Sequence, residues 1–367
     1  MTPDPVRPWL LGECLSLDLR PDQLAPLRAR LFVPGVLRDL TAFAGEDMLL
    51  SVLAERLLEN VLVPPSSPGR PGPADTLQQY LSSHHARREE MAQLLREIVS
   101  VLNGQGIEPI LLKGAQSLWT GQPAWRYMRD IDLLVPSDAA HAAQKALVAE
   151  GYHPDPDLPH RPHRHHLTPL YNARLSGWME IHRRGGNRYA ERLLPTEELA
   201  RATTVSSDGG LSVGLLDPAT HLLHALIHHH IGHSAFARGT ISLKGLHEFA
   251  WAAGELTEEQ RHRLVARASA HPWLAAVLDL WVAAAALFYS MPVNAPFAVR
   301  KDAAEQARTV LSVRSEAIWK YPGYGEEIRL AWAGDRLRRI DGGGNLVRRQ
   351  VLRARVIASM LPKIRRF

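Results

Sequence analysis

Two carboxylates stand one residue apart inside an apolar run, in the segment DIDLLV that begins at Asp130. Burying an unpaired carboxylate is costly, so apolar runs usually exclude acids. Side chains alternate between the two faces of a strand, so Asp130 and Asp132 project together, away from the apolar residues around them. Two carboxylates on one face repel unless a divalent cation or a shared proton lies between them. The spacing therefore points to a metal site, with a solvated face paired to nearby arginines as the alternative.

The residues before and after these acids have the features of a phosphate site. The expected strand IEPILLK ends at Lys113 and is followed by Gly114 and a short helix, a geometry that can present backbone N–H groups to phosphates. A third carboxylate, Glu180, lies in a second apolar segment, WMEIHR. If that segment pairs with DIDLLV, three acids converge beside an anion-binding turn, as a two-metal phosphoryl-transfer site requires.

The segments LLKGAQSL, RYMRDIDLLVP and GWMEIHRR together resemble the uncharacterised bacterial nucleotidyltransferases of the DNA polymerase β-like superfamily. The shared pattern is a Lys-Gly turn, then Arg-x-Met-x-Asp-Ile-Asp-Leu-Leu-Val, then an acid two residues before a histidine. The resemblance covers residues 110–183, and the matching positions are Lys113, Gly114, Arg126, Met128, Asp130, Asp132, Glu180 and His182.

This resemblance implies a chemistry and a set of roles. The metal ligands and catalytic carboxylates would be Asp130, Asp132 and Glu180, which would hold Mg²⁺ (or Mn²⁺) on the triphosphate of an NTP. Glu180 would also help to deprotonate the acceptor, whose oxygen would attack the α-phosphorus and release pyrophosphate. The implied nucleotide-binding residues are Lys113, Gly114, Gln116, Ser117 and Arg126. On this basis we also expect that Asp132→Ala abolishes transfer and leaves the fold intact.

A non-catalytic reading stays open beside the enzymatic one. The superfamily turn reads Gly-Ser, whereas here Gly114 precedes Ala115, so the serine contact to phosphate is lost unless Gln116 or Ser117 replaces it. That loss favours a degenerate member of the fold that binds nucleotide or RNA without chemistry, whereas the complete set of three carboxylates favours an enzyme. No feature selects the acceptor among small molecules, peptides or proteins, and RNA.

The histidines suggest a further alternative. His221, His224 and His228 follow each other at i, i+3 and i+7, so a helix would place them on one side, as in some zinc sites. This pattern would suit a metallohydrolase, and equally a helix whose histidines line a cleft or pack in the core. We keep His182, His228 and Lys244 as candidate residues of the active cleft. The segment HRPHRHH, residues 160–166, is expected to be a solvated, partly cationic loop.

The order of the expected helices and strands predicts an α+β protein, with a small mixed-sheet core between helical regions. By the resemblance, this core is a nucleotidyltransferase core. We expect a long helix capped by Asp75 or Thr76, a helix capped by Ser137, and a hairpin turn near Ser176–Gly177. The predicted domains are an N-terminal helical region over 1–104 with a Pro/Gly/Ser-rich loop at 63–75, the core over 105–216, and a C-terminal helical domain with a basic tail over 217–367.

The composition indicates the cellular compartment and argues against stable membrane insertion. The single cysteine, Cys14, excludes an intrachain disulfide and a cysteine-based zinc site, and it favours a reducing compartment, so we expect a cytoplasmic protein. The apolar segment 273–291 carries Asp279 near its middle, which favours a buried core helix over stable membrane insertion.

The positive charge is concentrated at one end of the chain. The formal net charge is +5, yet the residues from Arg336 onward hold ten basic side chains and one acid. This tail could contact an anionic partner such as a membrane or nucleic acid, or pack on the body through its apolar residues.

Overall fold

The computed structural model describes residues 7–63, 71–156, 165–172, 178–232 and 241–317. Contacts divide the chain into two compact units. Unit 2 is Leu19–His224, and unit 1 combines Met1–Asp18 with Ala225–Phe367, so the boundary between them falls inside one helix. The expected boundaries after residues 104 and 216 stay a prediction. The basic tail lies outside the described residues.

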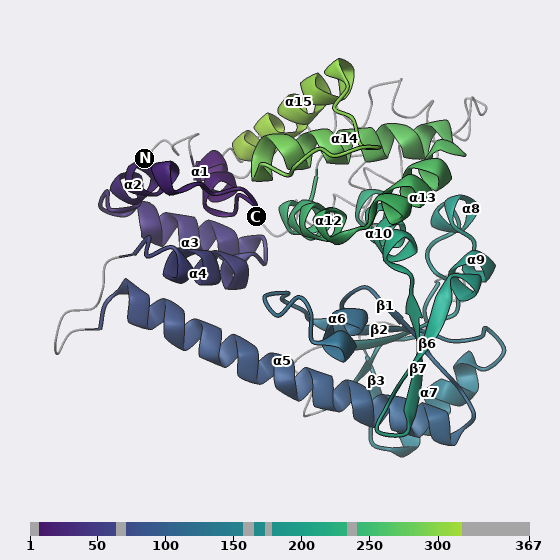
Figure 1. The fold of residues 1–367 in the computed structure, drawn as a ribbon. Helices are drawn as coiled ribbons and strands as arrows, with labels where there is room; N and C mark the ends of the chain where they lie inside the picture. The colour runs from purple at the N-terminus through teal and green to yellow at the C-terminus, as the bar shows by residue number, and fades with distance from the viewer. Residues whose placement is uncertain (1–6, 64–70, 157–164, 173–177, 233–240, 318–367) are drawn as a thin grey trace. The chain divides into compact units, whose positions relative to one another are not determined.

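A seven-stranded mixed sheet forms the centre of unit 2 (Figure 1), as the predicted α+β class requires. Its order is β3-β4-β5-β2-β1-β7-β6. The strands are β1 (Ile110–Leu112), β2 (Asp130–Leu134), β3 (His153–Pro154), β4 (Leu170–Tyr171), β5 (Trp178–His182), β6 (Thr203–Asp208) and β7 (Leu211–Leu216). The central strands β1 and β2 are short and apolar, apart from the two acids of β2.

Strand register brings the predicted site segments side by side. β1 runs antiparallel to β2, which places Leu112 opposite Asp132 and Lys113 just beyond the end of that pairing. β2 runs parallel to β5, and this register places Asp132 directly beside Glu180. Residues that are paired in register on neighbouring strands project to the same side of the sheet, so the two carboxylates share one face.

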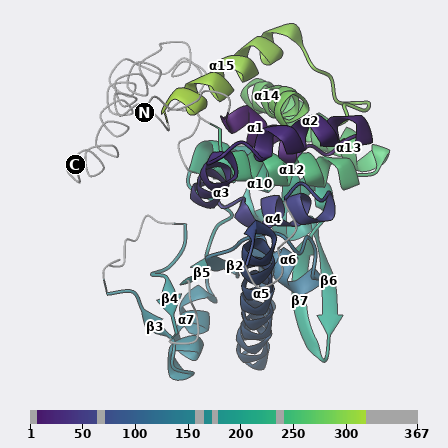
Figure 2. The same ribbon diagram turned by 90° about the vertical axis from the view of Figure 1, so that its left-hand side faces the viewer.

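Three helices pack against the sheet and explain why its acidic strand is otherwise apolar. They are α5 (Pro73–Gly104), α6 (Gly114–Thr120) and α7 (Ala140–Ala149). Figure 2 shows α5 with β6 and β7 on one side of it and α7 with β3 to β5 on the other. Ile131 and Leu133 are buried in a core that includes residues of all three helices. Alternation along the strand therefore turns Asp130 and Asp132 toward the opposite face.

Two predicted helix caps were wrong. α5 begins at Pro73, two residues before Asp75, and the Asp75 carboxylate accepts a hydrogen bond from the Gly72 backbone N–H at 2.8 Å. Asp75 therefore acts from the third helical position rather than as the N-cap. α7 begins at Ala140, because residues 137–139 form a turn, so Ser137 lies outside the cap position.

Of the antiparallel strand pairs in the sheet, β4 with β5 was predicted from the sequence and β6 with β7 was not. β4 and β5 pair antiparallel as expected, and the expected turn at Ser176–Gly177 lies outside the described residues. β6 and β7 form a second hairpin that the sequence reasoning missed. Its turn consists of Gly209 and Gly210, both with positive φ, and a Gly-Gly pair between two strands is a hairpin signal.

The remaining helices of unit 2 lie before and after the sheet strands. They are α2 (Pro21–Leu31), α3 (Val36–Glu46), α4 (Leu50–Glu59), α8 (Ala190–Leu193) and α9 (Thr196–Arg201). α4 packs on α5, and the Ser51 hydroxyl donates to the Trp125 carbonyl, which ties this helix to the segment just before β2.

Unit 1 is helical in its described part. Its helices are α1 (Arg7–Cys14), the end of α10 (Pro218–Ile227), the π-helix η1 (His228–Gly232), α12 (Leu243–Glu255), α13 (Glu258–Ser269), α14 (Pro272–Tyr289) and α15 (Lys301–Ala317). α1 packs against α14, with the Trp9 and Phe288 rings 5.4 Å apart. α1 thus belongs with the C-terminal helices rather than with the helices that follow it.

By length and composition, one described helix, α14, could cross a membrane, and 61% of the tested window is buried inside the structure. A mostly buried core helix passes the same test, so the apolar composition is weak evidence for insertion. The Asp279 carboxylate within this helix forms an ion pair with the Arg300 guanidinium at 3.2 Å.

Candidate active site

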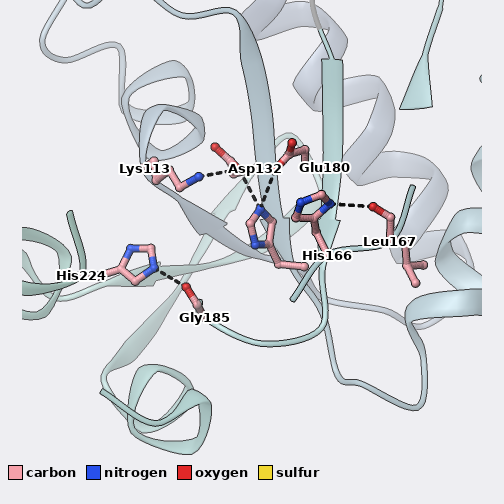
Figure 3. A network of polar contacts seen from close by, with 8 residues as sticks. Lys113, Asp132, His166, Leu167, Glu180, Gly185 and His224 are labelled. Carbon is pink, nitrogen blue, oxygen red and sulfur yellow. Dashed lines mark hydrogen bonds and ion pairs between the residues drawn. The ribbon is translucent and has the colours of Figure 1, made fainter. Parts of the chain in front are cut away.

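Asp132 is the centre of a buried polar network (Figure 3). Its Oδ1 accepts hydrogen bonds from Lys113 Nζ at 2.9 Å and from His182 Nε2 at 2.7 Å. The same His182 nitrogen lies 3.3 Å from Glu180 Oε2. Asp132 and His182 are each 1% exposed. Because hydrogen bonds to charged groups are strong in a low-dielectric setting, this network ties the residue after β1 to the middle of β2 and to the last residue of β5.

The network is arranged as two acids balanced by two bases. Burial raises the pKa of the Asp132 carboxyl, but Lys113 and the hydrogen bond from His182 outweigh burial and hold that pKa well below its usual range. Burial lowers the pKa of Lys113 and of His182, yet the attraction of Asp132 leaves both pKa values raised. Glu180 has a lowered pKa despite burial, because His182 hydrogen-bonds to it. The network therefore favours the ionised form of both carboxylates and shifts Lys113 and His182 toward their protonated forms.

The Lys-Gly turn between β1 and α6 has a demanding local geometry. Lys113 has φ 48° and ψ −118°, and residues with side chains seldom adopt a positive φ. A side chain at Gly114 would overlap the Met128 thioether, and the Arg126 guanidinium carbon lies 3.8 Å from the same position. Glycine at 114 and the Arg-x-Met pattern thus belong to one packing arrangement beside the Asp132 network.

The other predicted site residues occupy different surroundings. Asp130 starts β2 on the same face as Asp132 and is half-buried, but it is not part of the tight group of ligand atoms described below. The Gln116 side-chain amide donates to the Leu216 carbonyl at 2.9 Å. The Ser117 hydroxyl donates to the Pro123 carbonyl and accepts from Arg88 at 3.0 Å. Gln116 and Ser117 thus use these groups within the fold; their assignment to the nucleotide stays a prediction.

Two histidines from the expected solvated loop lie beside this network instead. His166 forms an isolated antiparallel bridge with His182, and their ring centres are 5.6 Å apart. The His165 ring centre lies 5.2 Å from that of His182, and burial lowers the pKa of His165 to about 3. The expectation for this part of the segment was therefore wrong. An HH pair before the apolar LTPLY was the available signal, because it continues a strand pattern.

The helical histidines do not form a second ligand set. His224 Nε2 donates to the Gly185 carbonyl at 2.8 Å, and burial lowers the pKa of His224 to about 4. His228 begins a π-helical turn, because the α-helix α10 ends at Ile227, so His228 does not continue the α-helical spacing of His221 and His224. Lys244, on α12 in unit 1, forms an ion pair with Glu248 at 3.7 Å. Among the described residues, His221, His224 and His228 form no three-ligand group.

The sequence matches one family model, described as "Uncharacterised nucleotidyltransferase", over residues 38–289. The chain belongs to this family. The match spans more than half of the chain and includes the whole sheet, the Lys-Gly turn and the Asp132 network. No curated protein matches the chain. The predicted family is thereby confirmed, and nucleotidyl transfer is the general activity that membership indicates.

Members of a nucleotidyltransferase family act through a divalent ion, and the Asp132 network fits one. The ligand atoms of Asp132, Glu180 and His182 all lie within 4.8 Å of one another. Carboxylate oxygens and imidazole nitrogens are ordinary ligands of divalent ions. His182 Nε2 contacts both carboxylates, and it would bind a divalent ion only after losing the proton that it shares with them. Asp132 and Glu180 belong to the predicted set, and the assignment of Asp130 as a third carboxylate ligand stays a prediction.

Proposed function

We propose that this protein transfers a nucleoside monophosphate from a metal-bound NTP to a hydroxyl or phosphate oxygen of an acceptor. The register of β2 with β5 carries the proposal, because it sets Asp132 beside Glu180 next to the Lys-Gly turn. A new bond forms between the acceptor oxygen and the α-phosphorus, and the bond to the β-phosphate breaks, so pyrophosphate leaves.

Each residue of the network has a separate part in this reaction. Asp132, Glu180 and His182 would hold the divalent ion, which when bound offsets charge on the attacking and leaving oxygens. Lys113 holds Asp132 in place from the other side and adds positive charge where the phosphates bind. Glu180 is the more accessible carboxylate, with its side chain 22% exposed against 2% for Asp132. It is therefore the group that takes the proton of an acceptor hydroxyl.

The second candidate function is nucleotide binding without transfer. Ala115 follows Gly114 where the superfamily has serine, and Ser117 uses its hydroxyl inside the fold. Both observations predict a lower affinity for the triphosphate than in a family member that catalyses transfer. The ionised pair Asp132 and Glu180 favours transfer.

The deciding experiment incubates the full chain with each of the four NTPs, labelled at the α-phosphate, and Mg²⁺ or Mn²⁺ in a bacterial lysate. Glu180→Gln serves as the matched control, because it removes a charge and keeps the side-chain shape. Label on a protein, RNA or small molecule with the wild type alone would support transfer and name the acceptor class. If no NTP labels anything, yet calorimetry shows metal–NTP binding that Glu180→Gln retains, the non-catalytic reading holds.

A further inference from the structure

Three rings, which we call the aromatic row, cross the sheet next to the carboxylates. Register pairs His153 of β3 with Tyr171 of β4. The pair of Leu170 with Met179 then sets Tyr171 opposite Trp178 of β5. The ring centres of His153 and Tyr171 are 5.7 Å apart, as are those of Tyr171 and Trp178. The aromatic row therefore runs from β3 through β4 to β5.

The aromatic row lies on the same face of the sheet as the carboxylates. Trp178 pairs with Asp130, two residues before the pair of Glu180 with Asp132. Residues paired in register project to the same side, and so do residues two apart on one strand. Met179, between Trp178 and Glu180, is buried in the core on the other face. Trp178 therefore projects beside Asp130 and in line with Glu180.

Trp178 is accessible, unlike the tryptophans that build the core. It is 41% exposed, whereas Trp119 is 8% exposed and Trp281 is 1% exposed. Its ring meets that of Tyr171 at an interplanar angle of 81°, an edge-to-face contact that aromatic pairs favour. Because this contact holds the ring, a planar ligand that stacks on Trp178 loses little free energy to ordering it. An exposed, supported tryptophan is the kind of side chain on which nucleic-acid bases stack.

The order of the strands places the aromatic row on the acceptor's side of the proposed centre. The Asp132 network lies between the Lys-Gly turn, which follows β1, and the aromatic row on β3, β4 and β5. Figure 3 shows Lys113 on one side of Asp132 and Glu180 on the other. In phosphoryl transfer, the attacking and leaving oxygens lie roughly in line on opposite sides of the phosphorus. With the phosphates at the Lys-Gly turn, the acceptor approaches from β5.

A positive charge adjoins the aromatic row. The Arg129 carbonyl accepts a hydrogen bond from the Trp178 N–H at 2.9 Å, so Arg129 and Trp178 are backbone neighbours. Arg129 is exposed, and it forms no ion pair with a carboxylate of the described residues. Its guanidinium can therefore bind an anionic group such as a phosphate. A stacking ring beside an exposed arginine suits a nucleotide unit, which carries both a base and a phosphate.

We propose that the aromatic row binds the end of a single-stranded nucleic-acid acceptor, with one base stacked on Trp178 and the terminal hydroxyl at Glu180. The proton of that hydroxyl passes to Glu180, its oxygen bonds to the α-phosphorus, and pyrophosphate leaves. The inference rests on the proposed function for this reaction and for the side from which the acceptor enters. Binding of the nucleic acid to the aromatic row needs neither metal nor NTP.

Fluorescence anisotropy tests the binding. Single-stranded RNA and DNA of the same sequence, each labelled at the 5′ end and about six nucleotides long, are titrated with the full chain without metal or NTP. We expect Trp178→Ala to weaken binding about 5–150-fold, as the loss of one stacked base predicts. Trp178→Phe retains an aromatic face and should recover most of the affinity. The oligonucleotide that binds more tightly through Trp178 identifies the acceptor as RNA or DNA.

Val205→Ala is the matched control, because Val205 is 66% exposed and lies on β6, at the other end of the strand order. Its affinity for the oligonucleotide should change less than about twofold. Equal affinity in the wild type and Trp178→Ala would overturn the proposal, as would the absence of binding to either oligonucleotide.

Calorimetric titration with metal–NTP separates the acceptor from the donor. Trp178→Ala should leave the affinity for metal–NTP within about twofold of the wild type. If Trp178→Ala instead weakens NTP binding and leaves oligonucleotide binding unchanged, the aromatic row binds the donor base and the proposal is overturned.

The labelling assay distinguishes failure of this inference from failure of the proposed function. Oligonucleotide binding that depends on Trp178, with no product labelled by any NTP, would contradict the proposed function and support the binding surface. Label that appears on a protein or small molecule, equally with the wild type and Trp178→Ala, would do the reverse.

Discussion

Two regions of this protein gather charged and titratable groups among apolar residues, and they do so in different ways. In the sheet network, Asp132 Oδ1 accepts from two bases at 2.7 and 2.9 Å. In the helical cluster of His229, Lys244 and Glu248, one carboxylate meets two bases at 3.8 and 3.7 Å. The sheet contacts are hydrogen bonds, whereas the helical contacts exceed hydrogen-bond length.

The source of the partners explains this difference. Lys244 and Glu248 are four residues apart on α12, so helix periodicity alone brings them together. The sheet network draws on residues up to 69 positions apart, from Lys113 to His182, and only strand pairing joins them. Its opposed carboxylates would repel at this distance without the bases or an ion between them. The sheet network therefore depends on its bases to hold two carboxylates together, and it has the greater capacity to bind a cation.

The largest effect is expected from Asp132→Asn, which keeps the shape and removes the charge. Transfer should fall by about 10²–10³-fold or more, and the free energy of unfolding should fall by about 3–5 kcal/mol, because Lys113 and His182 lose their buried partner. Initial rates and urea unfolding measure the two. The expectation that Asp132→Ala leaves the fold intact is revised on the same ground, since Asp132 is 1% exposed. Unchanged stability in Asp132→Asn would show that the charge of Asp132 does not stabilise Lys113 and His182 in the fold.

The pH dependence of stability should separate two buried histidines. His182 has a raised pKa beside two acids, whereas burial lowers the pKa of His224, beside a carbonyl, to about 4. A histidine in the unfolded chain has a pKa near 6.5. Between pH 6.5 and pH 4, the residue His224 is therefore protonated in the unfolded state and neutral in the folded state. The stability due to neutral His224 is full above about pH 6.5 and is lost as the pH falls toward 4, on the order of 3 kcal/mol.

His224→Gln retains a donor for the Gly185 carbonyl and removes the titration. Urea unfolding at pH 7 and pH 4.5 should therefore show a smaller loss of stability in the variant than in the wild type. The same loss in both proteins would mean that His224 is protonated in the folded state.

A smaller effect is expected where the Lys-Gly turn packs. Gly114→Ala places a methyl group onto the Met128 thioether, and overpacking of this kind typically costs about 1–3 kcal/mol. Met128→Ala in the same chain should recover part of that loss, so the double-mutant cycle should show a favourable coupling. Additive losses would indicate that the demand for glycine comes from somewhere other than Met128.

The smallest effect is expected in the helical cluster. Glu248→Gln removes the carboxylate shared by His229 and Lys244, whose side chains are 16% and 15% exposed. We expect a smaller loss of stability than in Asp132→Asn, because both contacts of Glu248 are longer than those of Asp132, and an unchanged rate of transfer. Thermal unfolding and the labelling assay check this, and a loss as large as that of Asp132→Asn would erase the contrast between the two regions.

The chemistry-bearing strands could be predicted because their signals are local. Period-two alternation placed Asp130 and Asp132 on one face, and the pattern around Lys113 and Glu180 indicated the family. The β6–β7 hairpin was missed although Gly209 and Gly210 marked its turn. The caps at Ser137 and Asp75 were placed wrongly by a few residues, as is usual for element ends.

The sequence by itself determined the family, the kind of fold and the two carboxylates that share a strand face, because each depends on residue type and short-range period. Only the tertiary structure decided which groups meet. Strand register set Glu180 beside Asp132, and a backbone bridge brought His166 against His182. Residue spacing along the chain does not encode these contacts, because register follows from how whole strands bury their apolar faces. The ligand set of the proposed ion is therefore a property of the folded sheet.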